Sequence, residues 1–275
     1  TQVKSNVNYT SNTKSFDRSV TAPGAPANLQ QYKLDGTTEL STGGGTNETS
    51  VIIEADISAV SSITMRLEAE IKPIATAFDG SGIIEGTPVT GTSFLNQRVT
   101  AGGLTDNTQY HWRARVINTN TLEASAWVAF GSNPSGDGST DGSPANSDIS
   151  IDLSAPIIST PCVVNPTASS CDGSLPSDTS AQVRWNTNEN ATRQVGYGIS
   201  CGSGSAAADV FAAMSQKEPP APSIVSASPH AVTLGALSTN TSYAYKIRAS
   251  DNAGNISFYP ADTSCGIFST ASAQT

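Results

Sequence analysis

Residues 104–116 read Leu-Thr-Asp-Asn-Thr-Gln-Tyr-His-Trp-Arg-Ala-Arg-Val, and residues 237–249 read Leu-Ser-Thr-Asn-Thr-Ser-Tyr-Ala-Tyr-Lys-Ile-Arg-Ala. In both stretches a leucine stands six residues before a tyrosine, with a polar turn between them. The tyrosine opens a run in which every second residue is apolar, and this period is typical of a strand that buries one face. The apolar residues are Tyr110, Trp112, Ala114 and Val116 in the first copy and Tyr243, Tyr245, Ile247 and Ala249 in the second.

A tyrosine at the start of such a strand, with its hydroxyl turned back to the preceding loop, is the tyrosine corner of immunoglobulin-like sandwiches. The Leu-x5-Tyr spacing resembles that of fibronectin type III domains. Two copies of the motif therefore predict an all-β chain made of two tandem fibronectin type III-like β-sandwiches. The predicted corner residues are Leu104, Tyr110, Leu237 and Tyr243.

The second half of the chain carries a further resemblance. Val183-x-Trp-x-Thr187 and Val195-x-Tyr-Gly198 are followed by His230-Ala-Val-Thr-Leu234 and by Asp251-Asn-Ala-Gly-Asn255. This series is similar to the fibronectin-like N-terminal domain of purple acid phosphatases and related secreted proteins, over most of residues 180–270. Such motifs specify a fold and say little about activity.

The chain has 275 residues, enough for two domains of ordinary size. We expect an N-terminal extension over residues 1–21, a first domain over 22–153 and a second over 154–275. The Gly/Ser-rich segment 131–147 is predicted to be a loop or flexible linker, with Ile149, Ile151 and Leu153 returning to the first sandwich. A short helix is expected at 206–214, ended by the prolines at 219, 220 and 222.

In the first domain we expect separate strands at Thr49–Ile57 and Met65–Lys72. The second of these alternates apolar and charged residues, which predicts one buried face and one solvated face. Arg113 and Arg115 are expected to form exposed cross-strand pairs with Glu68 or Glu70, or else to contact a partner.

Only 13% of the residues are charged, and the net charge is −9. The 14 basic residues are scattered, which argues against nucleic-acid binding because phosphate contacts need clustered Lys and Arg. No apolar run approaches the length of about 20 residues that a membrane helix needs. Because the chain starts at Thr1, we expect a mature form from which an export signal was removed, although a trimmed chain would look the same.

All four cysteines lie in the second half, without zinc-like spacing, and two disulfides are expected with the connectivity left open. Disulfides indicate a location outside a reducing cytosol. Asn-x-Ser/Thr acceptors make the protein a candidate glycoprotein, with weak support in a chain so rich in these residues. The cysteines are Cys162, Cys171, Cys201 and Cys265, and the acceptors are Asn8, Asn47, Asn190, Asn240 and Asn255.

No side chains form a convincing catalytic, cofactor-binding or metal-binding group. His111 and His230 are interpreted as surface histidines, because no partner ligand or orienting group is identified for either. Asp137 and Asp141 are assigned to a solvated linker, and Asp251–Asn255 to a turn in which Gly254 supplies a positive φ. The three tryptophans, Trp112, Trp127 and Trp185, are expected in the cores.

These observations favour a non-catalytic structural subunit of an extracellular, pilus-like filament or cell-surface assembly. We expect copies to polymerise head to tail, with Val3, Val7 and Tyr9 presented by a donor strand added to a neighbour's sheet edge. The strand could instead fold back on its own first domain. The alternative function is that of spacer or carbohydrate-binding modules in a larger secreted hydrolase or cell-adhesion protein, and an enzyme in its own right is disfavoured.

Overall fold

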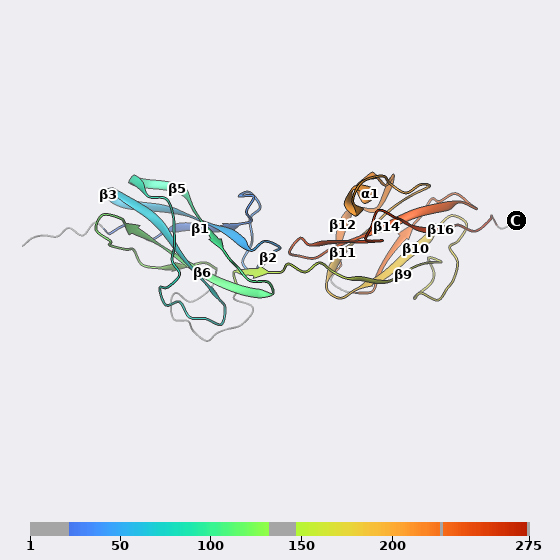
Figure 1. Ribbon diagram of the computed structural model, residues 1–275, viewed down its shortest axis with the longest axis horizontal. Coiled ribbons are helices and arrows are strands. Elements are labelled where there is room, and N and C mark those ends of the chain that lie inside the picture. The colour runs from blue at the N-terminus through green and yellow to red at the C-terminus, as the bar shows by residue number, and fades with distance from the viewer. Residues whose placement is uncertain (1–21, 132–146, 226–227, 274–275) are drawn as a thin grey trace, which may run out of the picture.

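The structure is a computed structural model that describes residues 22–131, 147–225 and 228–273. These residues form two β-sandwiches joined end to end (Figure 1). Each sandwich has its own core, since one cluster of buried apolar residues runs from Leu40 to Ile151 and the other from Ala181 to Phe268. No residue belongs to both clusters, and on this basis we propose that the first domain ends at Leu153.

The first sandwich consists of eight strands that all belong to one hydrogen-bonded sheet in the order β1-β3-β6-β8-β2, with β4 and β5 paired to β3 and β7 paired to β6. This sheet wraps around a core in which Trp112, Ile53 and Met65 are fully buried. The strands are β1 (Ala27–Tyr32), β2 (Gly44–Thr46), β3 (Ser50–Pro73), β4 (Ile84–Glu85), β5 (Val89–Gly102), β6 (Thr108–Asn118), β7 (Val128–Ala129) and β8 (Ile149–Ile151).

Strand β3 is the element that ties the two layers together. Its first half pairs with β1 and β5, and its second half pairs with β6. The expectation of two separate strands was therefore wrong. The connecting residues, Ser58 to Ser62, include no glycine, proline or asparagine to make a turn, so the backbone stays extended while the register shifts.

Both tyrosine corners have the hydrogen bond that defines the motif. The Thr105 N–H donates to the Tyr110 hydroxyl over 2.9 Å, and the Ser238 N–H donates to the Tyr243 hydroxyl over 2.8 Å. The leucines six residues upstream are also buried. Each corner thus fixes the turn against the core and sets where the following strand begins, which is β6 in the first sandwich and β14 (Ser242–Ser250) in the second.

The charged face of β3 is not solvated as expected. Glu68 and Glu70 lie opposite Arg115 and Arg113 on β6, as the alternation predicted, but both carboxylates are fully buried. Glu70 is bound by Arg113 at 2.7 Å and accepts the N–H groups of Asp79 and Gly80. The loop after β3 therefore covers this face.

Two aromatic side chains on this face also differ from expectation. Trp127 is half-buried and lies over the guanidinium groups of Arg113 and Arg115 at 4.4 and 4.5 Å, so it packs on the outer face rather than in the core. His111 is buried rather than exposed. Its ring stacks on Phe78, and its Nε2 lies 2.9 Å from the Thr76 carbonyl oxygen.

The second sandwich packs a three-stranded sheet, in the order β13-β10-β9, against a five-stranded sheet, in the order β12-β11-β14-β15 with β16 paired to β14. Its core holds Trp185, Leu234 and Ile247. The elements are β9 (Ile158–Val164), β10 (Ala181–Thr187), β11 (Ala191–Gly198), α1 (Ala207–Ala213), β12 (Gln216–Val225), β13 (His230–Leu234), β14 (Ser242–Ser250), β15 (Ile256–Tyr259) and β16 (Gly266–Ser269).

His230 is fully buried, which corrects the expectation of a surface histidine. It shares its strand face with Val232 and Leu234, stacks on Trp185 and lies 2.8 Å from the Thr187 hydroxyl. Burial, and secondarily the charge of Arg193, lowers the pKa of His230 below its usual value.

The expected helix is present, but it ends at Ala213, before the prolines. The Lys217 ammonium donates to the carbonyls of Ala212 and Met214, which suits the negative end of a helix. The prolines lie in β12 instead. Helix α1 packs directly on β11, where a Cβ at Gly196 would stand 2.9 Å from the Met214 side chain.

The four cysteines form two disulfides, Cys162–Cys171 and Cys201–Cys265. The first closes a loop beside β9, and the second joins the end of β11 to the segment before β16.

Replacing Tyr110 or Tyr243 with Phe is expected to lower the free energy of unfolding by about 1 kcal/mol, because the part-buried hydrogen bond from the turn N–H is lost. Urea denaturation followed by tryptophan fluorescence measures the change. Tyr32→Phe is the matched control, since its hydroxyl donates to the half-buried Gln30 side chain and binds no turn N–H in the described residues. Equal effects in all three variants would contradict a special role for the corners.

Removing the two disulfides should have unequal effects. The Cys201–Cys265 bond spans 64 residues and the Cys162–Cys171 bond spans 9. In the chain-entropy picture the longer loop contributes about 4 kcal/mol and the shorter about 2.5 kcal/mol. Paired Cys→Ser variants compared by calorimetry should show the larger fall in melting temperature when Cys201–Cys265 is removed, with the first sandwich nearly unaffected.

Candidate functional site

Among the described residues, side chains from several elements come together at the junction between the sandwiches and at a hollow at the far end of the second sandwich. At the junction, three carboxylates meet. Asp152 follows β8, Glu189 lies in the turn between β10 and β11, and Asp251 follows β14. One oxygen of each lies within 4.8 Å of the others, and within the described ranges no other such group of His, Cys, Asp or Glu was found.

Hydrogen bonds cross the junction beside this acidic cluster (Asp152, Glu189 and Asp251). The Asn255 amide donates to the Asp152 carbonyl oxygen and to the Asp251 carboxylate, both over 2.8 Å. The Lys33 ammonium donates to the Ala253 carbonyl oxygen over 2.9 Å. Backbone packing is close as well, since a Cβ at Gly45 would lie 3.4 Å from Ala253. These contacts hold the sandwiches in line.

The turn over Asp251–Asn255 has the conformation expected from its sequence. Gly254 has a φ of 102°, and Asp251 Oδ1 accepts the N–H groups of Gly254 and Asn255. Its part in the junction was not foreseen, because the sequence does not reveal which turn faces the neighbouring domain.

Glu189 is the electrostatically unfavourable member of the acidic cluster. Burial raises its pKa above the usual value, and the charges of Asp152 and Asp251 raise it further. Asp251 is stabilised by the donors of its own turn, whereas Glu189 meets two like charges. Oxygen ligands suit hard cations, but calcium takes six to eight of them and three carboxylates supply only part of that number. We therefore treat the cluster as a titratable part of the junction.

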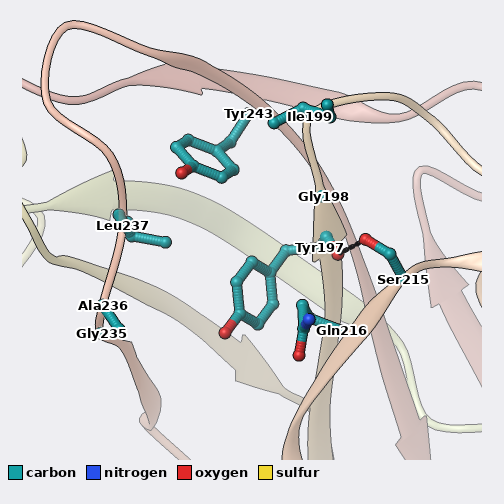
Figure 2. Close-up of a pocket in the computed structure, with 9 residues that line it drawn as sticks. All are labelled: Tyr197, Gly198, Ile199, Ser215, Gln216, Gly235, Ala236, Leu237 and Tyr243. Atoms are coloured by element: carbon teal, nitrogen blue, oxygen red, sulfur yellow. Dashed lines mark hydrogen bonds between the residues drawn. The ribbon is translucent and has the colours of Figure 1, made fainter.

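The hollow has a volume of about 320 Å³ and lies where β11 ends, β12 begins and the turn at residues 235–237 leads to the tyrosine corner. In Figure 2 the rings of Tyr197 and Tyr243 project towards the space between β11 and this turn, with Leu237 on the opposite side. We call this hollow the distal pocket. Strand β11 starts beside Glu189 and ends at Gly198, so the distal pocket is at the end of the second sandwich away from the junction.

The two tyrosines of the distal pocket are not poised for acid–base chemistry. The Tyr243 hydroxyl accepts the Ser238 N–H, and burial raises the pKa of Tyr197 above its usual value. The pocket is otherwise lined by small or apolar groups, with Ser215 and Gln216 at one side.

The other predicted residues are dispersed. Asn47, Asn190 and Asn240 are exposed, whereas Asn255 is half-buried with its amide nitrogen engaged at the junction. Asn8, Val3, Val7, Tyr9, Asp137 and Asp141 lie outside the described residues. The distal pocket could not be predicted from the sequence, because its lining comes from separate segments of chain.

No protein-family model and no curated protein matches the chain. Among solved structures, a crystal structure of the chicken CNTN1 FN1–FN3 domains is 17% identical, with a TM-score of 0.42, over 91% of this chain and 69% of that chain. The assignment of a tandem fibronectin type III-like fold rests on the strand order and the two tyrosine corners. No helix among the described residues is long and apolar enough to cross a membrane.

Replacing Glu189 with Gln is expected to raise the melting temperature at pH 7 by about 2 °C, a small gain because the site is partly screened by water. A raised pKa means that the folded state binds the proton more tightly, so protonation relieves the repulsion as the pH falls. The gain should shrink as the pH is lowered through the folded-state pKa of Glu189 and vanish near pH 4. Calorimetry at several pH values, with exposed Glu39→Gln as control, tests this, and a gain that does not vary with pH would contradict it.

Proposed function

We propose that the chain is a non-catalytic structural subunit of an extracellular filament or cell-surface assembly, in which copies join head to tail through residues 1–21. The observation that carries the proposal is the placement of the two ends. Gly24 donates to the Ser58 carbonyl oxygen at the end of the first sandwich away from the junction, while the distal pocket is at the opposite end of the second. A contact between unlike ends of an elongated molecule (Figure 1) is heterologous, and it builds an open filament when its rotation does not close into a ring.

The inter-domain hydrogen bonds support a mechanical role. Because Lys33 and Asn255 form hydrogen bonds between the sandwiches, the two domains act as one rod rather than as domains joined by a flexible linker. A rod of fixed length gives a filament a constant repeat.

Several titratable side chains form structural contacts inside the fold, which supports the proposal of a non-catalytic protein without a cofactor. His111 and His230 are both buried and engaged in stacking and hydrogen bonds. Glu68 and Glu70 are neutralised by arginines inside the fold. These groups stabilise structure and are shielded from a substrate.

The two disulfides support an extracellular location, because such bonds persist in oxidising compartments. The net charge of −9 supports a partner other than nucleic acid. We propose a second copy of this chain as that partner. The three exposed Asn-x-Ser/Thr acceptors, Asn47, Asn190 and Asn240, are compatible with glycans on the outside of the rod.

Two in-line modules would also serve as spacers or carbohydrate contacts in a larger secreted hydrolase or adhesin. Negative-stain microscopy of the native material separates the two functions. Ordered fibres with a regular axial repeat support the structural subunit, and dispersed particles contradict it.

Deleting residues 1–20 is expected to abolish fibre formation while leaving both sandwiches folded, because the described cores run from Leu40 to Phe268. Circular dichroism and calorimetry check the fold, and electron microscopy with sedimentation checks assembly. Native-looking fibres from the shortened chain would show that the N-terminal segment is not the connecting element.

A further inference from the structure

We propose that the distal pocket is the acceptor site on the neighbouring copy, and that it receives an apolar side chain from residues 1–21 of the next molecule. This inference rests on the proposed head-to-tail function and names the surface that would complete it. The candidate inserting side chains are the alternating Val3, Val7 and Tyr9.

The positions of the chain segments bring donor and acceptor together. Strand β1 begins opposite Asp56, near Ser58, and ends next to Lys33, which contacts Ala253 at the junction. Residue 22 therefore stands at the outer end of the first sandwich. When copies are stacked head to tail, the segment before residue 22 meets the outer end of the preceding second sandwich, where the distal pocket opens.

The strand edges beside the distal pocket favour addition of a strand there. Strands β12 and β13 are the terminal strands of their sheets. Most of β12 is a poor template, since Pro219, Pro220 and Pro222 have no N–H to donate. Its first three residues, Gln216–Glu218, keep their N–H groups, and Gln216 lines the pocket. The prolines thus interrupt the middle of this edge, while Gln216–Glu218 beside the hollow and residues 223–225 at the other end keep their N–H groups.

The size of the distal pocket admits one side chain of this kind, and its lining mixes polar with apolar surface. An apolar cavity of about 150 Å³ is enough to hold benzene, so about 320 Å³ admits a tyrosine or valine side chain with room for adjustment. The Tyr197 and Tyr243 rings and Leu237 offer apolar surface on opposite sides, and Ile199 at the rim is 79% exposed. Burial of such a rim residue is favourable on association.

Charge complementarity points to the same occupant. Residues 1–21 carry three basic residues and one acidic residue, a net charge of +2. Residues 22–153 carry 6 basic and 15 acidic residues, net −9, and residues 154–275 carry 5 basic and 7 acidic residues, net −2. Two sandwiches meeting end to end are both negative, and the cationic segment placed between them reduces their repulsion.

The test fills the distal pocket without disturbing the fold. Gly235 lines the pocket, a Cβ there meets no atom within 4 Å, and its φ is not in the left-handed region. In the full-length chain, Gly235→Phe should raise the critical concentration for assembly by roughly tenfold or more, the factor expected when one apolar side chain loses its site. Ala75→Phe is the matched control, because Ala75 is exposed and lines a different hollow on the first sandwich.

A second pair of variants guards against an unforeseen effect on folding. Ile199→Lys places a cation at the rim, where it repels the cationic segment, and is expected to weaken assembly. Ile157→Lys makes the same change at a residue that is 64% exposed near the junction, and should assemble normally. Melting temperatures of all four variants confirm that they fold.

A cross-link identifies the occupant. Tyr9 is replaced by the photoreactive residue p-benzoylphenylalanine in a mixture of ¹⁴N- and ¹⁵N-labelled full-length chains. The inference expects products that join a heavy and a light copy and that contain residues 197–199, 215–216 or 235–243. Products within a single copy, or on the first sandwich alone, would overturn it.

The outcomes separate the two proposals. If the native chain forms no fibres, the proposed function fails and the acceptor site fails with it. If fibres form equally in the native chain, Gly235→Phe and Ile199→Lys, the acceptor site is wrong while the structural function stands.

Discussion

The hydrogen bond from a turn N–H to a buried tyrosine hydroxyl is the constraint on which both sandwiches depend. It ties the backbone of an exposed turn to the core and fixes the residue at which the central strand starts. That strand then pairs on both sides, β6 with β3 and β8, and β14 with β11 and β16. In the second sandwich the same corner also supplies a wall of the distal pocket, so an element of the fold becomes part of the surface proposed for assembly.

The chain has few charges and places several of them inside. Buried carboxylates are costly unless they are paired and hydrogen-bonded. Glu70 meets this condition through Arg113 and two backbone donors. In the second sandwich the buried ammonium of Lys246 is satisfied by donating to three carbonyl oxygens, those of Pro260, Asp262 and Ser264. The buried charged side chains therefore hold loops in place over the sheets. Hydroxyl and amide groups cover much of the surface.

The sequence was sufficient for those features that depend on local period and spacing. The Leu-x5-Tyr motifs predicted both corners, and alternation placed Trp112 and Trp185 in the cores. Alternation failed to predict the surroundings of Trp127 and His111, because it indicates which face of the sheet a side chain lies on but not what covers that face. The loop after β3 covers the outer face of the first sandwich, and the positions of such loops depend on tertiary packing.

The second sandwich has a hollow at its distal end, and its covalent structure fits that feature. A hollow of about 320 Å³ beside the core forfeits the contacts that a closed end would make. The Cys201–Cys265 disulfide lies two residues beyond Ile199 at the rim and closes a long loop, which destabilises the unfolded chain and offsets that loss. It also ties the end of β11 to the segment before β16, so the rim keeps its shape with the hollow unfilled. A preformed acceptor loses less conformational entropy on binding than one that must be ordered first, and this is the physical reason to expect the cross-link and the pocket at the same end of the molecule.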